Sequence, residues 1–208
     1  MRILPSYVMG AGTPARMPSD STTRDLLSAV RQFYAVARSW HGEQPTADGA
    51  AGGIVEKALH LHAMNFGLWH HEDAARRTGA GDGEVARSKR AIDDLNDRRN
   101  AAIEDIDAAL LDAFEPSQNP RAPLHTETPG TVVDRLSVLA LRILHTDSAT
   151  DAGPRLAVLE EQYNDLFDGL LQFLTRLRGG EVRFKLYRQF KSAGQRSYCA
   201  LFEVPESG

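Results

Sequence analysis

Residues 59–77 read LHLHAMNFGLWHHEDAARR and combine an apolar face with an unusual number of functional groups. In an α-helix, positions i, i+4, i+7 and i+11 share one face. Starting at Asn65, this spacing selects Trp69, Glu72 and Arg76, so an amide, an indole, a carboxylate and a guanidinium line up. A solvated helix face does not need Trp and Asn between Leu and Glu. The stretch therefore predicts a helix that lines a cleft.

Further functional groups surround this stripe. His62 and Asp73 form a second file about a quarter-turn away on the same helix. For His60 and His71 we expect partial burial with a backbone partner, whereas His62 and His70 are candidate binding residues.

The composition is that of a globular protein with one core. The 208 residues suffice for such a core, and shares of 42% apolar and 25% charged residues are ordinary. A net charge of −4 with scattered Lys and Arg argues against nucleic-acid binding, which needs a basic patch. No apolar run approaches the roughly 20 residues that span a bilayer. No signal peptide is recognisable and Cys199 has no disulfide partner, so we expect a cytoplasmic protein without a membrane partner.

The periodicity of apolar residues predicts an all-α bundle of about five long helices. Gly, Pro, Ser and Thr in residues 1–21 predict a flexible arm, and residues 22–208 are expected to form one helical domain with an irregular C-terminal tail. The tail pattern fits a short helix or a strand equally well. The predicted helices cover about 22–40, 53–77, 83–114, 129–145 and 154–178.

Two further helices contribute polar groups. Lys89, Asp93, Asn96 and Asn100 follow one edge of the third helix. A short Gly-rich turn joins the second and third helices, so we expect an antiparallel hairpin in which this edge faces the Asn65 stripe. The fourth helix is apolar on two sides and is predicted to be central. Asp134 and Arg135 lie in its first two turns, where the helix dipole favours a carboxylate.

Several kinds of catalytic site lack a motif. The histidines and carboxylates of residues 60–73 do not follow a recognised metal-binding spacing, so neither a metal nor another cofactor is predicted. The glycines at 79–83 follow a helix rather than a strand, which argues against a phosphate-binding loop. No motif supports a nucleophilic Ser or Cys.

Carboxylate chemistry fits better. Glu72 and Asp73 diverge by about 100° on a helix, so neither can pair with the other across a substrate. A catalytic pair must instead cross between helices, joining Glu72 or Asp73 to Asp93 or Asp134. Trp69 would stack on a sugar ring, and the Asn side chains would bind hydroxyl groups.

The same residues allow a purely structural interpretation. A closed network would pair Glu72 with Lys89 or Arg90, and Asp93 with Arg76. Such a network would tie the helices together and leave no cleft.

The sequence resembles the Domain of Unknown Function family 4254. The similarity lies in long motifs between about residues 54 and 191, namely 61–76 (LHAMNFGLWHHEDAAR), 89–100 (KRAIDDLNDRRN), 126–137 (TETPGTVVDRLS) and 187–191 (YRQFK). Two positions depart from the family pattern. Asp97 stands where Gln is usual, and residues 191–194 (KSAG) replace a Lys-x-Tyr-Asn-Asp segment.

The resemblance implies an activity on sugar polymers. Actinobacterial members resemble an α-endomannosidase that trims a methylated mannose polysaccharide inside the cell. The expected activity is therefore a glycoside hydrolase with an oligo- or polysaccharide substrate, and with Glu72, Asp73, Asp93 and Asp134 as candidate catalytic residues. The candidate substrate-binding residues are His62, Asn65, Trp69, His70, Arg76, Lys89, Asn96, Asn100 and Arg135.

A bundle of this size cannot form the double helical ring of many all-α glycosidases, so a homodimer that completes the cleft is expected. The alternative is a non-catalytic helical partner of glycosyltransferases. It predicts a fully buried Trp69, closed ion pairs and no pocket. A role in acyl or nucleotide binding is a third, weaker alternative.

Overall fold

The structure is a computed structural model that describes residues 21–42, 52–79, 81–115, 119–147 and 153–186. Most of the predicted arm, residues 1–20, and the tail from residue 187 onward lie outside the described residues. Ser21, which the prediction placed in the arm, is the first residue of a helix.

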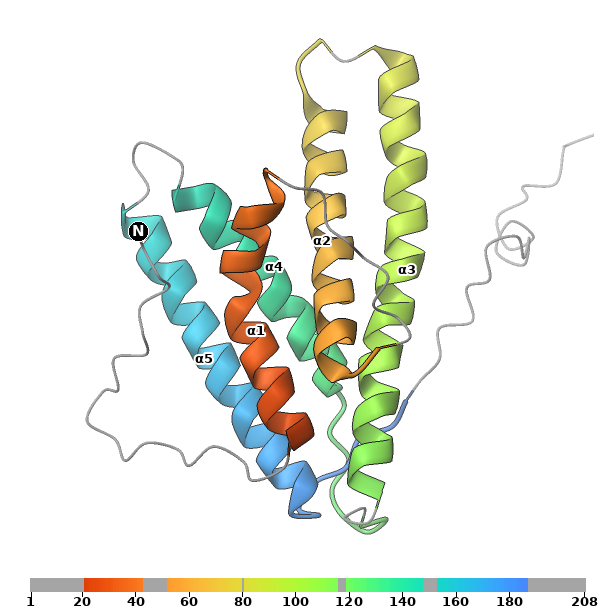
Figure 1. Ribbon diagram of the computed structural model, residues 1–208, viewed down its shortest axis with the longest axis vertical. Coiled ribbons are helices and arrows are strands. Elements are labelled where there is room, and N and C mark those ends of the chain that lie inside the picture. The colour runs from red at the N-terminus through yellow and green to blue at the C-terminus, as the bar shows by residue number, and fades with distance from the viewer. Residues whose placement is uncertain (1–20, 43–51, 80, 116–118, 148–152, 187–208) are drawn as a thin grey trace, which may run out of the picture.

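In the described part of the chain five helices form the bundle, which confirms the predicted all-α class (Figure 1). No β-strand occurs among the described residues, where a single bridge joins Leu124 and Arg183. The helices are α1 (Ser21–Trp40), α2 (Ile54–Arg76), α3 (Asp82–Phe114), α4 (Pro129–Asp147) and α5 (Gly153–Arg178).

Helix α4 is the central helix, as its two apolar sides predicted. It packs against each of the other four helices. Pro129 occupies the first helical position, and the Thr131 N–H donates to Thr128 Oγ1 at 3.3 Å, so Thr128 acts as the cap. Asp107 of α3 adds a second cap, because its Oδ1 accepts the Gly130 N–H at 2.7 Å. These contacts fix where α4 begins relative to α3.

Helices α2 and α3 form the predicted antiparallel hairpin. At the end that carries its turn, the hairpin extends beyond α1, α4 and α5, so the first half of α3 lies beside α2 there (Figure 1). Val85 and Ile92 in that half are therefore only half-buried, whereas Ile106 and Leu110 further along α3 are fully buried. Gly79 adopts φ +88° in the connecting turn, a conformation that favours glycine.

One contiguous apolar core is shared by all five helices. Its largest fully buried side chains include Phe33, Leu61, Ile106, Leu136 and Leu170, one from each helix. Among the described residues no helix is long and apolar enough to cross a membrane.

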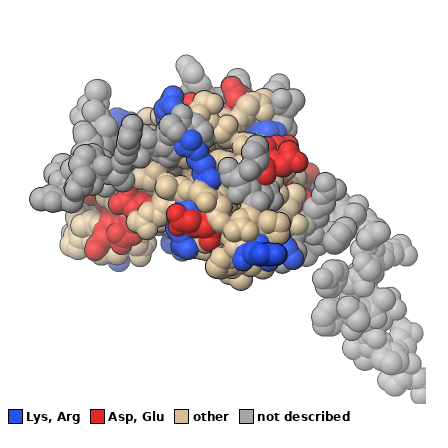
Figure 2. Space-filling model, turned by 90° about the horizontal axis from the view of Figure 1, so that it is seen from below, with Lys and Arg blue, Asp and Glu red and all other residues tan. Residues whose placement is uncertain are grey.

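Part of the C-terminal tail is extended. Residues 181–186 run beside the loop that precedes α4, where the His125 N–H donates to Arg183 O at 2.7 Å and the Arg183 N–H donates to Pro123 O at 3.1 Å. The first six residues of the tail are therefore extended and not helical, and they contain one isolated bridge instead of a full strand. On the face shown in Figure 2, acidic and basic residues are interspersed.

Candidate functional site

A chain of buried hydrogen bonds connects α2, α3 and α4. Asn65 Nδ2 donates to Asp134 Oδ1 at 2.9 Å and to Ser137 Oγ at 3.0 Å. Arg99 donates to Asp134 twice, from Nε to Oδ1 at 2.7 Å and from Nη2 to Oδ2. Asn65 and Asp134 are almost completely buried. Arg99 therefore offsets the cost of burying the Asp134 carboxylate, and this contact raises the pKa of Arg99 itself, so its guanidinium stays charged.

His62 is the last member of this series of hydrogen bonds and lies in the core. Its Nε2 lies 2.8 Å from Phe33 O, and its Nδ1 lies 2.8 Å from Ser137 Oγ. A carbonyl only accepts, so Nε2 carries the proton and Nδ1 accepts the Ser137 hydroxyl. Burial lowers the pKa of His62 to about 3, partly offset by the bond to Phe33. His62 is thus a neutral core residue rather than part of a cavity.

A cavity of about 270 Å³ opens next to this network, between α2, α3 and α4. It brings together most of the groups that the helical spacing selected, including the α2 stripe and one position of the α3 edge. Its volume is close to the lower end of ligand pockets, which begins at about 300 Å³. The lining residues are Asn65, Leu68, Trp69, Glu72, Asp73, Arg76, Asn96, Arg99, Val138 and Leu141.

The side chains that line this cavity differ in whether another residue already pairs with them or covers them. Glu72 is paired with Arg76 at 2.7 Å, with the Arg76 side chain largely exposed and that of Glu72 partly exposed. Asp73 has no ion pair among the described residues. Trp69 is half-buried, and one face of its indole stacks on His145 at a ring separation of 4.7 Å and an angle of 2°. The indole therefore contributes to the cavity wall with one face already covered.

A second cavity of about 660 Å³ adjoins the first and shares Arg99 and Val138 with it. Asp134 and Asp165 contribute carboxylates to its lining. Its other lining residues are Arg135, Leu139, Arg142, Gln162 and Leu166. Arg99 thus stands between two openings, with Asp134 beneath it.

Other predicted residues lie elsewhere. Lys89 and Asp93 are exposed on α3 and line none of the three cavities, so Asn96 is the member of the predicted α3 edge that shares the 270 Å³ cavity with the α2 stripe. Asn100 lines a third cavity. Arg135 is exposed and paired with Glu127 at 3.0 Å. The predicted pairs of Glu72 with Lys89 or Arg90 are replaced by the pair within α2.

The third cavity, of about 550 Å³, contains carboxylates that the sequence analysis did not single out. Burial raises the pKa of one of them, Asp107, to about 6, although hydrogen bonds from Thr128 and Gly130 act in the opposite direction. Glu104 and Glu127 line the same cavity. Asp107 follows Asn100 by seven residues and so continues the same edge of α3, but the segment between them reads as core, and the predicted edge ended at Asn100. Arg99, three residues after Asn96, could have been found by extending that edge.

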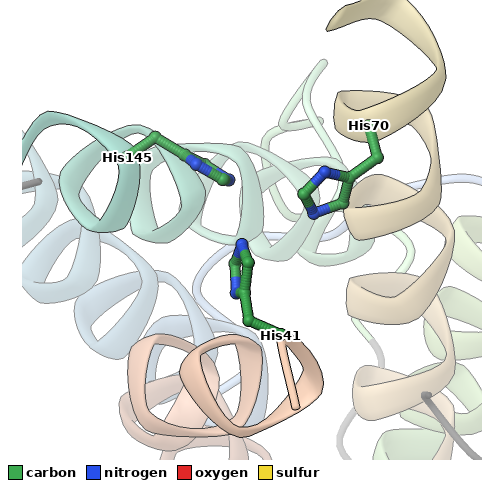
Figure 3. A group of neighbouring side chains, drawn as sticks. All are labelled: His41, His70 and His145. Carbon is green, nitrogen blue, oxygen red and sulfur yellow. The ribbon is translucent and has the colours of Figure 1, made fainter. Parts of the chain in front are cut away.

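Three histidines that share no motif also meet. His41 follows α1, His70 lies on α2 and His145 is near the end of α4, and each offers a ring nitrogen within 4.8 Å of the others (Figure 3). Burial and then the neighbouring imidazole of His41 lower the pKa values of His70 and His145, while Asp73 acts in the opposite direction. His70 therefore belongs to this cluster rather than to the lining of the 270 Å³ cavity.

The fold and the site define a helical-bundle protein with two adjoining open cavities that carry carboxylates, one lined by α2, α3 and α4 and the other by α3, α4 and α5. The chain belongs to the protein family of unknown function DUF4254, whose model matches residues 56–186. No match was found among curated proteins or among solved structures. The matched region includes every residue that lines the three cavities.

Proposed function

We propose that this protein is a glycoside hydrolase that cleaves an α-mannan-type, methylated mannose polysaccharide with a pair of carboxylates. The observation that carries the proposal is the 270 Å³ cavity, in which an indole, two amides, two arginines and the carboxylates of Glu72 and Asp73 meet. Sugar recognition needs an apolar ring surface beside hydrogen-bonding groups. The substrate class and its place inside the cell follow from the family resemblance.

The catalytic pair in this proposal joins α2 and α4. Asp134 is the ionised member, since Arg99 and Asn65 both donate to it. Glu72 or Asp73 is the proton donor. Asp93 has no part in the proposal because it is exposed and lines no described cavity. A separation of about 5–5.5 Å between the two carboxyls in the complex would give retention, and about 6.5–9.5 Å inversion.

The shape of the site favours an endo-acting enzyme in this proposal. Arg99 and Val138 are shared by the cavities of about 270 and 660 Å³, so a sugar chain can extend from one to the other across Arg99. Both are open to the surface, which leaves room for a second subunit to cover them. We include the homodimer in the proposal on this ground.

Closed ion pairs favour one other function, a non-catalytic helical partner that binds a glycan or a glycosyltransferase. Asp134 is fully engaged by Arg99 and Asn65, and Glu72 by Arg76. The half-buried Trp69 and the presence of a cavity argue for the hydrolase.

The deciding experiment incubates the purified protein with α-1,4-mannooligosaccharides, methylated and plain, and follows product length by mass spectrometry. We expect shorter products. As single substitutions, Asp134→Asn and one of the pair Glu72→Gln and Asp73→Asn should each lower kcat by about 100-fold or more, the usual scale of acid–base catalysis. NMR of the first-formed anomer then assigns retention or inversion.

The matched control is Asp94→Asn, because Asp94 is an exposed α3 carboxylate with 70% of its side chain accessible. Its activity should equal that of the wild type. Binding of the oligosaccharides without any cleavage would support the non-catalytic partner instead, and size-exclusion chromatography with light scattering tests the dimer.

A further inference from the structure

Three imidazoles converge at the junction of α1, α2 and α4. The ring centroids of His41 and His70 are 5.1 Å apart, those of His41 and His145 are 5.3 Å apart, and those of His70 and His145 are 5.5 Å apart. The ring planes meet at angles between 65° and 77°. The rings thus point at a common centre from three separate elements instead of stacking (Figure 3).

The last turn of α1 orients His41, which directly follows that helix. Its Nδ1 lies 3.0 Å from Ala37 O. Because a carbonyl only accepts, Nδ1 carries the proton, and the Nε2 lone pair is left for another partner. Histidines that bind metals commonly donate their second ring N–H to a backbone carbonyl in this way, which fixes the tautomer and the ring orientation.

Several buried nitrogen atoms at this junction lack a hydrogen-bond partner. His70 Nε2, His145 Nε2 and Trp69 Nε1 are buried and have no hydrogen-bond partner among the described residues. Buried polar atoms nearly always have a partner, so two bare imidazole nitrogens beside a third imidazole indicate a missing ligand. An indole nitrogen donates only, whereas an imidazole nitrogen can bind a cation.

The surroundings hold the rings in place and favour a cation. Phe66 packs edge-on against His70 at 4.4 Å and against His41 at 5.2 Å, and Trp69 stacks on His145. The negative charge of Asp73 acts on both His70 and His145. No Lys or Arg takes part in these contacts.

We propose that His41, His70 and His145 form a binding site for one divalent transition-metal ion, with Zn²⁺ as the preferred ligand. Neutral imidazole suits zinc, and three histidines with one open position are a known zinc coordination set. Nitrogens on a tetrahedral zinc ion lie about 3.3 Å apart, given Zn–N distances of about 2.0–2.1 Å. The three candidate nitrogens now lie within 4.8 Å of one another, and small side-chain rotations would bring them to the separation that zinc requires.

The ion would join three helices. His41 precedes residues 56–186, so the family match alone does not contain the complete site. The ion would lie behind Trp69, on the face of the indole that His145 covers. This inference is independent of the hydrolase, because it assigns the ion no step in sugar cleavage.

The test uses the full chain with its purification tag removed, because a polyhistidine tag binds the same metals. After treatment with a chelator and desalting, ZnCl₂ is titrated by calorimetry, and CoCl₂ is titrated while the visible absorption of Co²⁺ is recorded. We expect one equivalent per chain, a tetrahedral cobalt spectrum and a higher Tm with zinc, since a ligand that binds only the folded state stabilises it.

His41→Ala is the main variant, because His41 is exposed and its loss leaves the core intact. It should weaken zinc binding by more than about 100-fold, since changes outside the ligand set already cost 10–100-fold. His145→Gln should do the same, with the folded state checked by circular dichroism. His71→Ala is the matched control, one residue from His70 but outside the cluster, and should bind like the wild type.

The absence of stoichiometric binding by the wild type would overturn the proposal. Equal affinity in His41→Ala and the wild type would overturn it as well, because the ion would then be bound elsewhere. Loss of binding in His71→Ala but not in His41→Ala would assign the ion to a different set of histidines and reject the site proposed here.

Discussion

Arg99 on α3 and Asp134 on α4 form a two-point ion pair, with Nε of Arg99 2.7 Å from Oδ1 of Asp134 and Nη2 donating to Oδ2. The Asp134 side chain is only 7% exposed and that of Arg99 30%. The pair connects the α2–α3 hairpin to the central helix α4, and Arg99 lines both of the cavities of about 270 and 660 Å³.

Arg99→Ala should therefore destabilise the protein by about 3 kcal/mol, the lower end of the cost of leaving a buried charge unpaired. Urea unfolding at pH 7 measures this change. Arg98→Ala is the control, because Arg98 is half exposed and lies 3.8 Å from the exposed Asp94. Its effect should stay within about 0.5 kcal/mol. Equal effects of the two substitutions would show that the Asp134 carboxylate does not depend on Arg99.

His62 should make the protein less stable in acid. Its folded-state pKa of about 3 lies below the ordinary histidine pKa of 6.5, so the unfolded chain binds the proton more readily. The free energy of unfolding therefore falls as the pH drops from 6.5 towards 3. The loss that is due to His62 is about 2 kcal/mol between pH 7 and pH 5. It is measured as the difference between the wild type and His62→Gln at both pH values, and a difference that does not change with pH would contradict it.

Asp107 should act in the opposite direction. Burial raises its folded-state pKa to about 6 from the ordinary aspartate pKa of 3.8, so the folded protein binds the proton more readily. Its contribution to stability is present below pH 3.8 and is lost as the pH rises through 6. The free energy of unfolding of Asp107→Asn should therefore rise relative to that of the wild type by about 2 kcal/mol between pH 4 and pH 8. Unfolding curves at the two pH values test the sign, and a shift in the other direction would place the pKa of Asp107 below its usual value.

Gly130 should not tolerate a side chain. A Cβ atom there would lie 2.6 Å from the backbone oxygen of Ile103 and 2.9 Å from Asp107 Oδ1. Because a backbone oxygen cannot rotate away, Gly130→Ala should cost about 2 kcal/mol. The control is Gly169→Ala on α5, where no atom lies within 4 Å of the added Cβ. That substitution should stabilise the helix by up to about 1 kcal/mol, and the two Tm values should move in opposite directions.

Much of the fold was predictable because it depends on local patterns. The 3.6-residue period, the Gly-rich turn after residue 77 and the Thr128-Pro129 start gave the five helices, the hairpin and the central α4. The Asn65, Trp69, Glu72 stripe was found for the same reason, since residues on one helix keep fixed relative positions. Lys89 and Asp93, expected on the same stripe, are exposed and do not line this cavity, which the helical period alone could not show.

The sequence by itself determined which groups share a helix face, and hence the bundle and half of the cavity lining. Only the tertiary structure decided which groups from different helices meet: Arg99 with Asp134, Asp107 with the start of α4, and His41 with His70 and His145. The physical reason is that periodicity fixes angles within a helix but not the axial offset between helices. That offset is set by side-chain packing over the whole core, where a shift of one turn, about 5.4 Å, replaces every partner.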